Sequence, residues 1–180
     1  MLSFINSPPQ PGYNDMNKIV LIVAALLFIS TGSHAEAQSE LLNNDKALQG
    51  VTKTKAYFDV TIGDPKALLI RLELIEKTYH QLVAAGLSPD LVIGVRGKAS
   101  GFFTKGNGYV LDSDLPKKEH IAAMVKKLTG MKIGIEQCRI AAGFEDIDVA
   151  DFLPEMELVA NGYVSMIGFH AQGYAFVPMD

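Results

Sequence analysis

The chain has 180 residues, a hydrophobic fraction of 48% and a formal net charge of −4 at neutral pH. A mildly acidic chain without a cluster of basic residues is a poor nucleic-acid binder, so composition disfavours that class of partner. A single cysteine excludes an internal disulfide and a CxxC redox cycle, so any thiol chemistry must involve a second molecule.

The N-terminal region has the pattern of an export signal. Lys18 precedes an uninterrupted apolar run over 19–29, and small residues follow it as far as Ala37. The run is shorter than the roughly 20 apolar residues that cross a bilayer. We therefore predict a signal peptide over 16–37 that is cut after Ala35 or Ala37. The mature protein is expected to be periplasmic or secreted, without a membrane span.

The predicted signal divides the chain into four parts. Residues 1–15 contain no Lys or Arg, so we interpret them as a mis-assigned start extension before a true start at Met16. A polar lead-in covers 38–53. Residues 54–180 form one predicted domain, because the mature chain of about 145 residues has the usual size of a single domain.

A strand and a long helix open this domain. The β-branched and aromatic residues of 56–62 predict the strand. Asp64 followed by Pro65 is a strong helix start. The helix has one apolar face and ends at Gly86; that face consists of Leu68, Leu72, Ile75, Tyr79, Leu82 and Val83.

Four further strands alternate with helices along the chain. The strands are predicted over 91–95, 131–135, 156–159 and 174–177. A helix that begins at Ser113 or Asp114 and ends at Gly130 lies between the first two. Later helices are predicted after Cys138, from Asp148 over 149–153, and from Asn161 to Gly173, with Tyr163, Met166, Ile167 and His170 on one side of the last. Residues 96–108, with four glycines, predict a loop with at most one helical turn.

This alternation predicts the fold class. It indicates an α/β three-layer sandwich, a five-stranded, mainly parallel sheet flanked by helices on both faces. Sites in such folds lie at the carboxyl ends of the strands. Three segments are expected at that edge: 63–64, 96–101 and 137–143.

Cys138 is the leading candidate for chemistry. The free amides of the following residues, together with the guanidinium of Arg139, are expected to favour the thiolate, while Glu136 opposes it if it faces the sulfur. A thiolate attacks sulfur, accepts a persulfide or binds a metal. The alternative is that Cys138 is a small buried apolar residue of the core. Both interpretations stay open on the sequence alone.

The segment after the second predicted strand is a candidate anion site. Arg96, Gly97, Lys98 and Ser100 can present backbone amides, a hydroxyl and two cations to a small anion. A flexible surface loop is the alternative, since neither GxxxxGK[ST] nor GxGxxG occurs. The histidines lack HxH or HExxH spacing, so neither a metal site nor a cofactor is predicted.

Four stretches in order resemble the DsrE/DsrF-like family, specifically its small exported members. They are 63–65 after the first strand, the apolar strand 91–95 leading to Gly97, the strand that ends at Cys138 with a small-residue turn after it, and 173–178, similar to a closing GYAY-x-P segment. They span nearly all of 54–178. The resemblance implies a five-stranded parallel sheet and assembly into homo-oligomers, trimers or hexamers. It also implies a cysteine that carries a persulfide to a partner, a role that only Cys138 can inherit.

Two functional hypotheses follow. In the first, Cys138 of an exported protein accepts sulfane sulfur as a persulfide from a donor and passes it to an acceptor protein, with Arg139, Arg96, Gly97, Lys98 and Ser100 binding the substrate. In the second, the protein is a non-catalytic oligomeric binding module in which Cys138 is structural. A disulfide-linked dimer through Cys138 is a third option.

Overall fold

The computed structural model describes residues 43–180, which belong to two compact units. The described part of the first unit, Met1–Gly50, contains the short helix α3 (Asp45–Leu48). The second unit, Val51–Asp180, contains the sheet. The predicted start extension (1–15) and signal peptide (16–37) lie outside the described residues. Among the residues described, no helix has both the length and the apolar character needed to span a membrane.

The second unit contains a five-stranded sheet in which every pairing is parallel, with strand order β4-β3-β2-β1-β5. This confirms the predicted fold class, with an all-parallel sheet where a mainly parallel one was expected. The strands are β1 (Thr54–Val60), β2 (Pro89–Val95), β3 (Gly134–Cys138), β4 (Glu157–Val159) and β5 (Ala175–Pro178).

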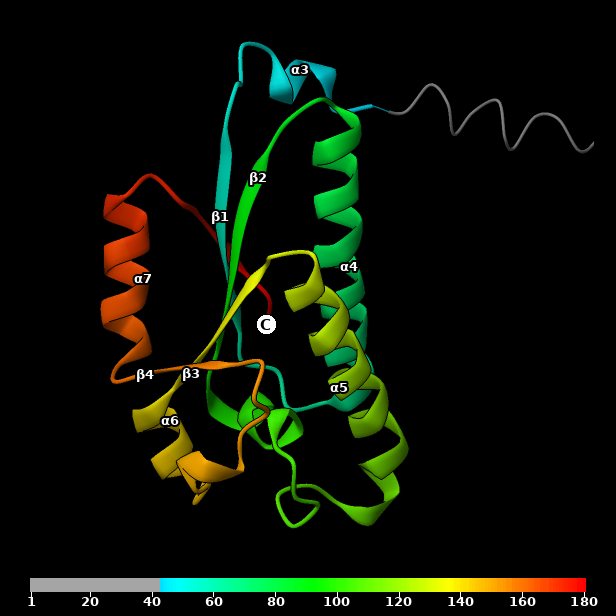
Figure 1. Ribbon diagram of the computed structural model, residues 1–180, viewed down its shortest axis with the longest axis vertical. Helices are drawn as coiled ribbons and strands as arrows, with labels where there is room; N and C mark the ends of the chain where they lie inside the picture. Colours follow the sequence, from blue (N-terminus) through cyan, green and yellow to red (C-terminus); the bar gives the residue numbers. More distant parts are fainter. Residues whose placement is uncertain (1–42) are drawn as a thin grey trace, which may run out of the picture. The chain divides into compact units, whose positions relative to one another are not determined.

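Helices cover both faces of the sheet. The α-helices of this unit are α4 (Pro65–Ala84), α5 (Leu115–Gly130), α6 (Arg139–Phe144) and α7 (Gly162–Ala171). Three 3₁₀ helices lie between them: η1 (Gly97–Phe103), η2 (Asp112–Asp114) and η3 (Val149–Asp151). Figure 1 shows α4 and α5 on one side of the strands and α7 on the other. This is the three-layer arrangement that the alternation of elements predicted.

Side-chain caps start most of the predicted helices. The carboxylate of Asp64 accepts a hydrogen bond from the Ala67 amide at 2.7 Å, and Pro65 occupies the first helical turn of α4. At α7, the Asn161 side chain accepts from the Tyr163 amide at 3.0 Å. Asp114 precedes α5 but makes no such cap bond. The capping residues therefore set where α4 and α7 begin, as their sequences indicated.

The third strand lies three residues later than predicted. Met131 and Lys132, expected in the strand, form the turn that leaves α5, and Lys132 takes a left-handed conformation with φ 65°. Their amides bond to carbonyls of the last turn of α5. As a result β3 runs to Cys138 itself, and the thiol is carried by the last residue of a strand.

The segment 96–108 is more ordered than the predicted loop. Its first half is the 3₁₀ helix η1, in which Ala99, Ser100 and Phe103 are fully buried. Gly101 allows the close packing, because a Cβ there would lie 2.7 Å from the Tyr109 carbonyl oxygen. The η1 half of this segment therefore belongs to the core under the carboxyl edge of the sheet, whereas residues 105–108 are exposed.

The two faces of the sheet differ in how they are covered. The main core lies between the sheet and α4, α5 and η1, and includes Phe58, Ile93 and Ile135. On the other face, a small cluster around Tyr57 and Val92 packs against α7. Because side chains alternate along each strand, that second face also carries Asp59, Glu136 and Cys138.

The packed side of α7 matches the expected one only in part. Tyr163 and Ile167, expected on its apolar side, are 59% and 71% exposed. Met166, which was expected there, and Phe169, which was not, make the contact with the sheet. The reason is that helix periodicity identifies faces but not which face meets the sheet, and nearly all of α7 is apolar.

Candidate functional site

Cys138 lies where the first turns of two helices meet the end of β3. It is the last residue of β3 and the N-cap of α6. Its sulfur accepts hydrogen bonds from the Ala141 amide at 3.4 Å, in the first turn of α6, and from the Gly162 amide at 3.2 Å, the first residue of α7. The positive ends of two helices therefore point toward one sulfur atom. Two backbone N–H donors from separate helices thus converge on this sulfur.

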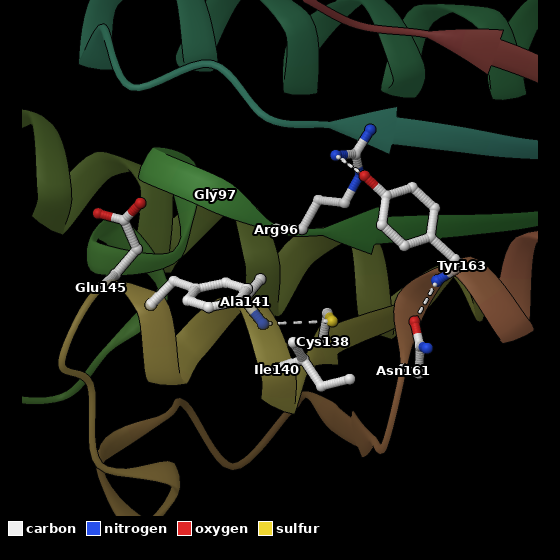
Figure 2. A pocket seen from close by; sticks show the side chains of 9 residues that line it. Arg96, Gly97, Cys138, Ile140, Ala141, Glu145, Asn161 and Tyr163 are labelled. Atoms are coloured by element: carbon white, nitrogen blue, oxygen red, sulfur yellow. Dashed lines mark hydrogen bonds between the residues drawn. The ribbon is translucent and has the colours of Figure 1, made fainter.

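The sulfur borders an open pocket of about 320 Å³. Its lining comes from the start of η1, the end of β3, the helix α6 and the start of α7, and consists of Arg96, Gly97, Cys138, Ile140, Ala141, Phe144, Glu145, Asn161 and Tyr163. Figure 2 shows Arg96 and Tyr163 on one side of the sulfur and Ile140 and Ala141 on the other. Cys138 is only 5% exposed, so a reagent reaches its sulfur through this pocket and not from the open surface.

Arg96 is the cation of the pocket, and Asp59 neutralises it. The guanidinium donates from Nε to Oδ1 of Asp59 at 2.8 Å and from Nη2 to Oδ2 at 2.6 Å. Its Nη1 donates to the hydroxyl of Tyr163 at 3.3 Å, and its Cζ lies 5.0 Å from the centre of that ring. The hydrogen bonds to Asp59 raise the pKa of Arg96 above its ordinary value. All three nitrogens of the guanidinium therefore donate hydrogen bonds.

The sheet register explains why these residues meet. Asp59 pairs with Gly94, and Gly94 pairs with Glu136. The last residue pair between β2 and β3 is Val95 with Gln137. The next residue along each of these two segments is Arg96 after β2 and Cys138 in β3. Parallel strands that end together thus place Arg96 beside Cys138 at the carboxyl edge, where the fold class predicts a site.

Of the residues predicted to bind substrate, only Arg96 and Gly97 line the pocket at Cys138. Lys98 lines a separate pocket, where its Cβ packs over Gly63. Ser100 is fully buried in η1, and its hydroxyl accepts from the side-chain amide of Gln137 at 2.9 Å. Arg139 is exposed and is not among the lining residues of the pocket. The structure therefore divides the predicted anion site between the pocket, a second cavity and the core.

Five residues of the site were missed by the sequence reasoning. Phe144 and Glu145 lie just beyond the segment 137–143 that was expected at the edge, and the other three were assigned other roles. Asp59, Asn161 and Tyr163 were interpreted as a strand residue, a helix cap and one side of a helix. The available signal was Asp59, a charged residue inside a strand of apolar and aromatic residues. Such a residue requires a partner of opposite charge when it is buried, and Arg96 was the cation predicted at the same edge.

Two further titratable groups lie on the same face of the sheet, below the pocket. Glu136 is buried, and its Oε2 has no hydrogen-bond partner. Burial raises its pKa, Glu157 raises it further, and the hydroxyl of Ser165 opposes this. Burial likewise raises the pKa of Tyr57, with the carboxylates of Glu136 and Asp59 adding to the effect. These two groups favour their protonated forms next to the site.

Nothing in the described range 43–180 forms a group of three or more His, Cys, Asp or Glu side chains that could hold a metal ion.

The fold and this pocket define a parallel α/β sandwich domain with one thiol at the carboxyl edge of its sheet. No family model matches the chain. An uncharacterized protein of Aquifex aeolicus (strain VF5) is 31% identical over 125 residues, which cover 69% of this chain and 55% of that protein. The chain thus spans about half the length of the curated relative that it matches.

A solved structure supports the architecture. The protein of unknown function MTH1491 from Methanobacterium thermoautotrophicum matches with a TM-score of 0.54 and 14% identity. The match covers 71% of this chain and 98% of that one. At this identity the similarity shows the fold alone.

Proposed function

We propose that this protein is an exported member of the DsrE/DsrF-like family that handles sulfane sulfur, with Cys138 as the accepting thiol. The observation that carries the proposal is the position of its sulfur, which borders a pocket and accepts two backbone N–H donors from the first turns of α6 and α7. The five-stranded parallel sheet and the location of Cys138 at the end of β3 agree with what the resemblance implies.

The proposed step is a sulfur transfer without net oxidation or reduction. The Cys138 thiolate attacks the outer sulfur of a donor persulfide, R–S–SH. A new S–S bond forms on Cys138, the S–S bond of the donor breaks, and the donor leaves as the thiolate RS⁻. The product is Cys138–S–SH, so atoms and charge balance. An acceptor thiolate then takes the outer sulfur by the same exchange.

The surrounding groups have distinct roles in this step. The amides of Ala141 and Gly162 donate to the attacking sulfur, and Tyr163 and Arg96 line the pocket that the added sulfur would enter. The low solvent exposure of Cys138 limits its contact with oxidants in solution, to which persulfides and thiolates are sensitive.

Mass spectrometry tests the proposal directly. The purified domain is incubated with a polysulfide or an organic persulfide and then weighed intact. We expect a gain of one sulfur atom on the native protein and none on Cys138→Ser, because the chain has no other cysteine. If Cys138 gains no sulfur from any donor while the protein stays folded, the proposal is wrong.

The low exposure of Cys138 favours a second candidate, a non-catalytic binding module in which the cysteine is structural. Alkylation separates the two. A thiol that a small haloacetamide modifies in the folded protein supports the sulfur acceptor. A thiol that reacts only after unfolding in urea supports the module.

Location and assembly belong to the same proposal. The pattern of the N-terminal sequence supports export with cleavage after Ala35 or Ala37, which N-terminal sequencing of protein from the periplasm or medium tests. Exposed apolar residues on α7 and β5, including Val164, Ile167 and Phe176, support a homo-oligomer. A trimer or hexamer is the expected result of light scattering.

A further inference from the structure

The pocket at Cys138 has no unpaired positive charge. Arg96 is the only cation among its lining residues, and both Nε and Nη2 are bonded to the buried carboxylate of Asp59. Glu145 adds a carboxylate to the lining. The formal charges of these three side chains therefore sum to a negative value, although a basic residue stands next to the thiol.

The other cations of this edge do not change the balance inside the pocket. Lys98 lines a different cavity, and the exposed Arg139 is not part of the lining. Solvent screens the charge of an exposed side chain strongly, whereas the Asp59–Arg96 pair is only partly exposed. A dianion that enters the pocket thus meets two amide dipoles but no free cation.

One wall of the pocket is apolar. Ile140, Ala141 and Phe144 contribute it, and Ile140 and Phe144 are 45% and 82% exposed. Exposed apolar side chains next to a pocket gain free energy when a ligand covers them, in proportion to the apolar area removed from water. The wall therefore suits a ligand with an apolar substituent near its reactive sulfur.

We infer that this pocket selects sulfur donors by charge and polarity, with Asp59 as the positioning residue that sets its charge. Its substrates are organic persulfides that are neutral or singly charged and carry an apolar substituent. Doubly charged inorganic oxyanions such as thiosulfate are poor donors. This inference rests on the proposed function of Cys138 as a sulfur acceptor.

Paired alkylating reagents test the charge selectivity without any sulfur transfer. Iodoacetamide and iodoacetate have nearly the same size and differ by one negative charge. We expect the rate ratio of neutral to anionic reagent at Cys138 to exceed the ratio for free cysteine about tenfold, the effect of one like charge at close range in a medium less polar than water. The full chain is used for every variant.

Two substitutions identify the source of the selectivity. Asp59→Asn keeps a hydrogen-bond acceptor for Arg96 but removes the neutralising charge, so the ratio should fall to that of free cysteine or below it. Glu145→Gln, at a partly exposed position, should lower the ratio of neutral to anionic alkylation rates by a smaller factor. This second variant keeps the test valid if Asp59→Asn unfolds the protein. Glu119→Gln, at an exposed position of α5, is the matched control and should leave the ratio unchanged.

The apolar wall is tested with a third reagent. N-benzyl iodoacetamide should react faster than iodoacetamide by about threefold to tenfold, the effect of covering part of an aromatic ring. Phe144→Ala should remove this advantage, whereas Val83→Ala, an exposed apolar position of α4, should retain it.

The outcomes separate this inference from the proposed function. A native ratio equal to that of free cysteine, or one that neither Asp59→Asn nor Glu145→Gln changes, overturns the charge selectivity. Loading of Cys138 by thiosulfate as fast as by benzyl persulfide also overturns it, yet supports the sulfur acceptor. A high ratio with no sulfur uptake from any donor supports the selectivity and overturns the acceptor. No alkylation by any reagent in the folded protein overturns both.

Discussion

The sulfur of Cys138 lies 3.2 Å from the backbone nitrogen of Gly162, a contact that joins the end of β3 to the start of α7 across 24 residues. The glycine permits it, because a Cβ at position 162 would lie 3.1 Å from Cβ and 3.5 Å from Sγ of Cys138. The first turn of α7 can therefore approach the thiol closely because Gly162 has no side chain.

Gly162→Ala should reduce the reactivity of Cys138. The added methyl group is too close to Cys138 by a few tenths of an ångström, so the thiol must move away from the Gly162 amide. We expect the alkylation rate in the folded protein to fall several-fold, with a stability change of about 1 kcal/mol or less, since alanine also favours the helix. Gly168→Ala, on the same helix with open space around it, is the control and should leave the rate unchanged.

Arg96→Gln should destabilise the protein by about 2 kcal/mol, because it leaves the carboxylate of Asp59 buried without its partner. Fully buried pairs cost roughly 3–5 kcal/mol when broken, and this pair is partly exposed. The ion pair between Lys127 and Glu76 has the same N–O distance, 2.6 Å, but its lysine is 56% exposed. Lys127→Gln should cost less than about 1 kcal/mol. Urea unfolding measures both, and equal losses would show that burial does not decide the strength of the Arg96 pair.

Glu136→Gln should stabilise the protein at neutral pH but not at acid pH. Burial raises the pKa of Glu136 from its ordinary value near 4.5, so the folded state binds its proton more tightly than the unfolded chain does. The native protein therefore loses stability as pH rises from about 4.5 through the raised value, and the variant does not.

The difference should reach about 1 kcal/mol, the cost of a buried polar group without a partner. Urea unfolding at several pH values between about 4 and 8 measures it. Glu73→Gln, at an exposed position of α4, should show no such trend. A difference that is constant with pH would mean that Glu136 does not titrate with folding.

Gly94→Ala should be the most damaging single methyl addition in the sheet. A Cβ at this position would lie 1.8 Å from the hydroxyl oxygen of Tyr57 and 2.3 Å from Cζ, so the buried ring must leave its place. Overpacking of this kind costs about 3 kcal/mol or more. At Gly134, on the adjacent strand, the nearest atom to an added Cβ is a Val92 methyl at 3.6 Å. Gly134→Ala should therefore change the free energy of unfolding by less than about 1 kcal/mol.

Much of the fold could be predicted because its signals are local. The Asp64-Pro65 pair and Asn161 identify helix starts through bonds to amides two or three residues away. The apolar runs identify strands that both faces of a sheet bury. Strands alternating with helices leave few topologies other than a parallel sheet. These features depend on neighbours in sequence, so the chain order alone shows them.

The boundaries near the site could not be read in this way. The strand that carries Cys138 was placed three residues too early, because Met131 and Ile133 are as apolar as the strand residues that follow. Only the pairing of Ile135 with Ile93 and the left-handed turn at Lys132 set its true start. Likewise, the glycines of 96–108 suggested a loop, whereas the first half of that segment is η1, in which Gly101 packs closely against Tyr109.

The sequence by itself determined the class of the fold and that a single thiol follows a strand toward the sheet edge. Only the tertiary structure decided the charge and shape of the pocket. Asp59, Arg96, Cys138 and Tyr163 come from four separate segments of the chain, and the register of three parallel strands together with the docking of α7 brings them to the same edge of the sheet. Local periodicity identifies which residues share a face. Which residue neutralises the charge of another, or covers it, depends on packing between segments far apart in the chain.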